Sequence, residues 1–75
     1  MTALQAEVKA KRDILRSIYG GMMSLSDLCQ EIGMNKDRAR AWAKEHEVGA
    51  LIGTRVKYDT DLVAKAIVYS RGAVA

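Results

Sequence analysis

The 75-residue chain has few of the residues that build disulfides, metal sites and catalytic centres: it has one cysteine, one histidine and no proline. Because Cys29 is alone, it forms no intrachain disulfide, and with His46 as the one histidine it leaves too few ligands for a structural zinc site. Nothing supports a Ser-His-Asp triad either. We therefore predict no enzymatic activity, no catalytic residues, no metal site and no cofactor.

Long hydrophobic runs are also missing. The longest uncharged apolar stretches are shorter than the ~20 residues that a membrane-spanning helix needs. The first twenty residues are charged throughout, which is unlike a cleavable signal peptide. We therefore expect a reducing, cytoplasmic environment and no membrane partner.

What the chain does contain fits one small domain, 1–75. Hydrophobic residues make up 49% and charged residues 28%, but phenylalanine is absent and there is one tryptophan, which predicts an aliphatic interior. A chain of this size buries about 60% of its surface on folding, which leaves little room for an enzyme pocket. The net charge of +3 allows a nucleic-acid partner without requiring one.

The first segment, 1–21, predicts a helix over residues 2–19, ended by Gly20-Gly21. Apolar residues recur at helical spacing and form a stripe: Leu4, Val8, Ile14, Leu15 and Ile18. Four cations occupy the other faces: Lys9, Lys11, Arg12 and Arg16. Two interpretations of these cations stay open, a solvated helix face and direct contacts with phosphate.

Residues 24–46 predict two short helices joined by a tight turn. Ser24 is a good N-cap, and Asp27 three residues later completes a capping box. Gly33 ends this first helix and Asn35 begins the next. One apolar face is predicted for the first helix: Leu25, Leu28, Cys29 and Ile32.

The second of these helices, 36–46, has Ala39, Trp42, Ala43 and His46 on one side, which predicts its core face. We expect Trp42 to be the main ring of a thin core. His46 is interpreted as a carbonyl cap or core-edge residue rather than a ligand. Cys29 is interpreted as a small buried hydrophobe rather than a reactive thiol.

From residue 48 the pattern changes to short β-prone runs, 48–52 and 56–58, around Gly53-Thr54-Arg55, which predicts a β-hairpin. Asp59 or Thr60 then caps a last helix, 59–70, and residues 71–75 are expected to fray. The predicted buried stripe of that helix is Leu62, Val63, Ala66 and Ile67.

Two short helices with a tight glycine-containing turn are typical of a helix-turn-helix. The outward face of the second helix and the following hairpin carry the candidate DNA-binding residues: Lys36, Asp37, Arg38, Arg40, Lys44, Arg55 and Lys57. Asp37 has two interpretations, reading cytosine N4 or pairing with Arg40. The hairpin also has two, a DNA contact and a cover over the edge of the core.

Residues 23–67 resemble the small excisionase and MerR-like winged helix-turn-helix domains. The matching features are the cap at Ser24, the turn 33–35, the exit Lys44-Glu45, the hairpin 52–58 and Leu62. Two positions depart from the pattern: Gly49 replaces the proline that commonly opens the hairpin, and Thr54 replaces an arginine, which weakens the expected hairpin contact. The first strand of the predicted hairpin is also one residue shorter than in the family pattern.

The resemblance implies a mainly α fold with a small β-hairpin, a winged helix-turn-helix with an extra N-terminal helix. It implies sequence-specific binding of double-stranded DNA, as a recombination directionality factor or a small transcriptional regulator of a phage or mobile element. A recombinase or RNA polymerase then fits as a protein partner, and a homodimer or a cooperative filament on DNA fits as an assembly. The alternative is a protein-binding module that acts through the N-terminal helix or through Met22, Met23 and Met34.

Overall fold

The computed structural model describes the backbone of residues 2–74 and the side chains of residues 2–70. This part of the chain is mainly helical, with four helices and one three-stranded antiparallel sheet. The elements run in the order α1 (Ala3–Tyr19), β1 (Met22–Met23), α2 (Leu25–Ile32), α3 (Lys36–Glu45), β2 (Gly49–Ile52), β3 (Arg55–Asp59) and α4 (Thr60–Val74).

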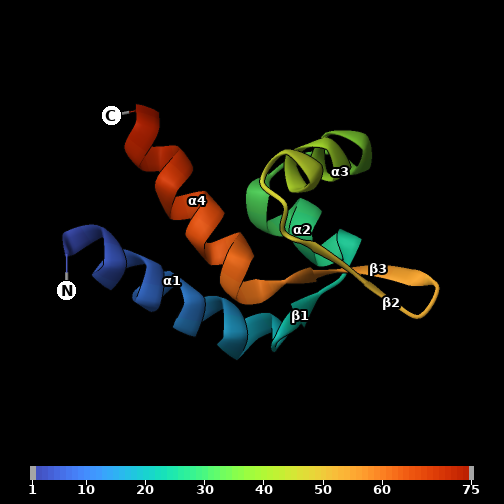
Figure 1. Ribbon diagram of the computed structural model, residues 1–75, viewed down its shortest axis with the longest axis horizontal. Coiled ribbons are helices and arrows are strands. Elements are labelled where there is room, and N and C mark those ends of the chain that lie inside the picture. Colours follow the sequence, from blue (N-terminus) through green and yellow to red (C-terminus); the bar gives the residue numbers. More distant parts are fainter. Residues whose placement is uncertain (1, 75) are drawn as a thin grey trace.

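Helices α1 and α4 come from opposite ends of the chain and pack against each other (Figure 1). Their junction is tied by Thr60, which is fully buried: its hydroxyl donates to the carbonyl of Gly20 at 2.8 Å and its backbone N–H donates to that of Gly21 at 3.1 Å. Arg16 and Asp61 add a bidentate ion pair, in which Nε and Nη2 of Arg16 donate to Oδ1 and Oδ2 of Asp61 at 2.7 and 3.1 Å. The N-terminal helix is therefore part of the domain.

The buried side of α1 differs from the predicted stripe. Leu15 is fully buried, whereas Ile14 and Ile18 are 55% and 62% exposed. The half-buried residues Leu4 and Val8 lie on the same side as Leu15, so the contact with α4 follows one narrow face. The prediction that Ile14 and Ile18 belong to the core face was wrong, because isoleucines on a flank of the helix widened the apparent stripe.

The predicted ends of α2 and α3 are confirmed. Ser24 and Asp27 form a reciprocal capping box at the start of α2. Gly33 ends the helix in a left-handed conformation, with φ of 67°. The side chain of Asn35 then accepts from the backbone N–H of Arg38 at 2.9 Å and begins α3. Short-range capping therefore fixes the tight turn between the two helices.

The core side of α3 is made of small residues. Ala39 and Ala43 are buried, which lets α3 pack closely on α2. Trp42 is only half-buried, and its ring lies 4.6 Å from that of His46, the residue that ends α3. The expectation that Trp42 is the main ring of the core is corrected: the buried core consists of aliphatic side chains and Tyr58.

The hairpin forms as predicted, with a tighter turn. Ile52 pairs with Arg55, so the turn is the two residues Gly53-Thr54, and Gly53 has the positive φ of 65° that this turn needs. Strand β1 was not predicted. It pairs with the inner end of β3, so the sheet order is β1-β3-β2 (Figure 1).

Helix α4 is capped by Asp59, whose side chain accepts from the backbone N–H of Leu62 at 3.1 Å. Its buried residues include Val63 and Ala66 as predicted, but Leu62 is 44% exposed and was wrongly placed in the stripe. The helix continues to Val74, past the predicted end at 70. Ala75 lies outside the described residues. No helix in the described part is long and apolar enough to cross a membrane.

Candidate nucleic-acid interface

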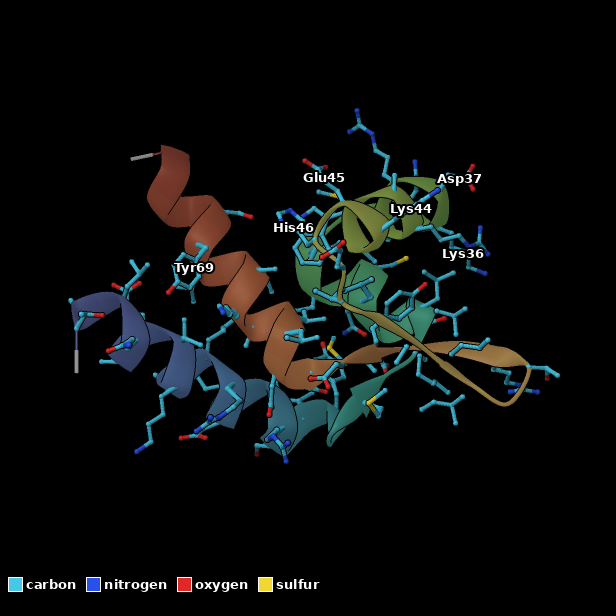
Figure 2. The ribbon with its side chains drawn as sticks, viewed as in Figure 1. Lys36, Asp37, Lys44, Glu45, His46 and Tyr69 are labelled. Atoms are coloured by element: carbon cyan, nitrogen blue, oxygen red, sulfur yellow. The ribbon has the colours of Figure 1, made fainter. Side chains whose placement is uncertain are left out.

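The outward surface of α3 is strongly polar because its two buried residues lie on one side. Lys36, Asp37 and Lys44 point to the side of α3 on which the hairpin extends, whereas Glu45 and His46 lie toward α4 and Tyr69 (Figure 2). All four predicted cations of this helix are exposed: Lys36, Arg38, Arg40 and Lys44.

Asp37 was given two interpretations, reading cytosine N4 or pairing with Arg40, and the structure contains the pair with Arg40. Arg40 Nη1 lies 3.4 Å from Asp37 Oδ1, and the Asp37 side chain is 97% exposed. A carboxylate in the first turn of a helix also interacts favourably with the helix dipole. This geometry favours the pairing interpretation of Asp37.

Most cations near the hairpin have no carboxylate partner within the described side chains. The ion pairs of residues 2–70 join Lys11 to Glu31, Arg12 to Asp13, Arg16 to Asp61 and Arg40 to Asp37. Five of the predicted site residues therefore form no ion pair with a described carboxylate: Lys36, Arg38, Lys44, Arg55 and Lys57. Lys9 on α1 and Lys65 on α4 also form no ion pair with a described carboxylate.

The hairpin does not present its cations on the side of α3. Val56 pairs with Leu51 and Tyr58 pairs with Gly49, and these residues share the sheet face next to α3. Because successive side chains point to opposite faces, Arg55 and Lys57 lie on the other face. The structure thus gathers the cations of α3 on one surface and leaves those of the hairpin on another.

An open groove of about 630 Å³ separates α3 from the hairpin. Arg40 and Lys44 line one side of it, and exposed Leu51 and Val56 line the other. Neither apolar residue was predicted to belong to the site. The alternation of side chains within the hairpin could have indicated that the two share a face, but not that α3 lies beside it.

Three of the four cations of α1 form ion pairs within the protein. Lys11 Nζ lies 3.0 Å from one oxygen of Glu31, and the hydroxyl of Tyr19 donates to the other oxygen at 3.1 Å. Burial and the adjacent Glu31 carboxylate raise the pKa of Tyr19 above its ordinary value. Arg16 holds the pKa of Asp61 below its ordinary value, chiefly through their hydrogen bond. For Lys11, Arg12 and Arg16 these ion pairs disfavour the interpretation as phosphate contacts, whereas exposed Lys9 has no described carboxylate partner.

No group of three metal-ligating side chains lies together among the described residues. Cys29 is a free cysteine that packs, partly buried, against the core. Comparison with protein-family models, with curated proteins and with solved structures gives no significant match. The resemblance to excisionase and MerR-like domains therefore stays a prediction that rests on the residues quoted above.

Proposed function

We propose that the chain is a winged helix-turn-helix domain that binds double-stranded DNA sequence-specifically, with α3 as the recognition helix and β2–β3 as the wing. The observation that carries this proposal is the distribution of ion pairs. The cations of α3 and the hairpin other than Arg40 have no described carboxylate partner, whereas three of the four cations of α1 (Lys11, Arg12 and Arg16) are each paired. Unpaired cations can neutralise phosphates without first losing an internal contact.

The geometry of α3 supports a division of roles. On a helix in the major groove, residues of the N-terminal part approach base edges most closely. Arg40 lies one turn into α3 and is the candidate for a bidentate contact with guanine. Lys44 and Lys36 are candidates for phosphate contacts, and Asp37 orients Arg40 through their ion pair. Lys57 on the hairpin is expected to contact phosphate only.

Within this proposal, the resemblance suggests a recombination directionality factor or a small transcriptional regulator, without enzymatic activity. The direct test measures binding of the whole chain to pooled genomic duplex fragments over a range of salt concentrations. The proposal predicts a shifted complex at low salt and a steep linear fall of log K with log salt. Failure to shift any duplex at low salt would contradict it.

A second candidate function is protein binding through α1. It is favoured by the exposure of Ile14 and Ile18, which lie one turn apart on α1. The two candidates differ in their salt dependence, because an apolar contact with a protein releases few counterions. Ile14→Ser together with Ile18→Ser should leave DNA affinity unchanged if the first candidate is correct.

A further inference from the structure

Strand β2 lies at the edge of the sheet, and its backbone groups alternate between the neighbouring strand and the open edge. The backbone N–H of Asp59 donates to the carbonyl of Val48 at 2.9 Å. Hydrogen-bonded and non-hydrogen-bonded residue pairs alternate along an antiparallel pair of strands. Counting from Val48, the N–H and C=O groups of Ala50 and Ile52 therefore point to β3. The N–H and C=O groups of Gly49 and Leu51 therefore point to the free edge.

Apart from its short length, this edge lacks the usual protection against pairing with another strand. Natural edge strands carry charged side chains, proline or a bulge. Here the four residues of β2 are uncharged, and Leu51 and Ile52 are 73% and 53% exposed. Each of the two leaves apolar surface at the same edge as the unpaired backbone groups.

Two residues of this edge have complementary shapes: the side chain of Leu51 projects, and Gly49 leaves a gap. Leu51 projects on the face next to α3, and Gly49, two residues away on the same face, has no side chain. A Cβ at Gly49 would lie 3.6 Å from Val56 and 3.8 Å from the Tyr58 ring, so the gap opens over apolar atoms. It lies in the groove between α3 and the hairpin.

We propose that β2 pairs antiparallel with β2 of a second copy of this chain, about a two-fold axis through Ala50. In this register Gly49 of each copy faces Leu51 of the other, and these are the residues whose backbone groups point to the edge. Each such pair exchanges two hydrogen bonds, so the interface gains four. Each leucine fills the gap over the other copy's glycine.

The charged residues nearest to β2 lie on opposite faces of the sheet. The antiparallel register brings the hairpin turn of one copy beside Glu47 of the other, directly before β2. Arg55 follows that turn, is exposed and has no described carboxylate partner. Glu47 is also exposed and forms no described ion pair, but it lines the groove on the α3 face, so the two side chains do not pair across the interface.

The assembly has a geometric consequence for α3. The two-fold axis is perpendicular to the joined six-stranded sheet, so both α3 helices lie on the same face of it. Pairing through β2 needs no DNA and does not rest on the proposed function. A paired edge of four residues is small compared with a standard interface of about 800 Å² per partner, so the dimer is weak and concentration-dependent.

The register can be tested by cross-linking in solution without DNA. In a Cys29→Ala background, Ala50→Cys places two thiols opposite each other in a non-hydrogen-bonded pair, where the Cα separation of about 4.5 Å suits a disulfide. With oxidised glutathione this variant should form a covalent dimer at least tenfold faster than either of two controls. The controls are Lys57→Cys, on the same face one strand further in, and Thr54→Cys, in the exposed turn.

The energetics can be tested by sedimentation equilibrium up to about 1 mM protein. Gly49→Pro removes an edge N–H from each copy and Leu51→Ala removes the projection, so each should raise the dimer Kd by about tenfold. Leu62→Ala, which removes an exposed leucine from α4, should leave the Kd unchanged. A wild-type chain that stays monomeric, or an Ala50→Cys rate equal to those of its controls, would overturn the proposal.

Discussion

The two halves of the molecule carry similar numbers of cations but use them differently. In the α1–α4 half, Lys11, Arg12 and Arg16 each pair with a carboxylate, and two of these pairs tie α1 to another helix. In the α3–hairpin half, defined by α3, β2 and β3, the one described ion pair joins Arg40 to Asp37 within α3. The position of the carboxylates, more than the number of cations, thus distinguishes a structural surface from a candidate binding surface.

Both halves bury some apolar side chains and expose others, but the two exposed sets lie in different places. The α1–α4 half buries Leu15, Val63 and Val68 and exposes Ile14 and Ile18 on the outer side of α1, whereas the hairpin exposes Leu51 and Val56 beside α3. Burial in the first half stabilises the fold, since each fully buried aliphatic side chain contributes about 1.5–3 kcal/mol. Exposed apolar residues in the second half contribute little stability and are available for contacts.

The largest expected effect concerns Leu15, the fully buried residue of α1. Leu15→Ala should lower the free energy of unfolding by about 3 to 4 kcal/mol, because it leaves a cavity between α1 and α4. Ile14→Ala, one residue away and exposed, should change it by about 0.5 kcal/mol or less. Chemical denaturation measures both. Equal losses would show that the buried face of α1 is assigned wrongly.

Trp42 should matter less for stability than a buried aromatic residue would. Because its ring is half-exposed and packs on His46, Trp42→Ala should cost about 1 to 2 kcal/mol. The variant should therefore still unfold cooperatively in a thermal melt, at a lower temperature than the wild type. If the Trp42→Ala variant were unfolded at room temperature, Trp42 would be a central residue of the core and this account of it would be wrong.

Arg40 tests the α3–hairpin half directly. Arg40→Ala should cost about 1 to 3 kcal/mol of binding to a preferred duplex and reduce the preference for it over a scrambled one. Lys57→Ala should weaken both duplexes equally and lower the salt slope by about one. Binding isotherms on the two duplexes separate these outcomes. An unchanged preference in Arg40→Ala would show that α3 does not read bases.

The smallest expected effect is the pH dependence of the Arg16–Asp61 pair. Arg16 lowers the pKa of Asp61 below its ordinary value of 3.8, so the pair stabilises the fold above that pH and this stability is lost as the pH falls through the lowered pKa. Wild type should therefore melt slightly above Asp61→Asn at neutral pH, and the difference should shrink below about pH 4. Thermal melts across this range measure it. A difference that stays constant with pH would contradict the assignment.

Local signals in the sequence predicted both ends of α2 and the start of α3 correctly. Ser24 with Asp27, Gly33 and Asn35 act within three or four residues, so their effect can be predicted without knowing the rest of the fold. The same holds for the hairpin, since its strands are joined by a two-residue turn. Even the ion pair of Asp37 with Arg40 follows from helical spacing.

Features that depend on distant packing were not predictable. Strand β1 exists because Met23 meets Tyr58, 35 positions later, and a two-residue strand has no periodicity of its own. Ile14 and Leu62 look buried by spacing, but which side of a helix is covered depends on the helices around it. For the candidate site, helical spacing predicted the cations of α3, while the groove with Leu51 depends on how the hairpin lies beside α3.

The central claim is that the cations of the α3–hairpin half bind DNA and those of the α1–α4 half do not. Two double variants with the same change in net charge test it: Lys36→Gln with Lys44→Gln, and Lys9→Gln with Lys65→Gln. All four lysines are exposed and form no described ion pair. The measurement is the slope of log K against log salt for duplex DNA. The first variant should lower the slope by about two and the second should leave it unchanged, whereas equal losses in both would contradict the account.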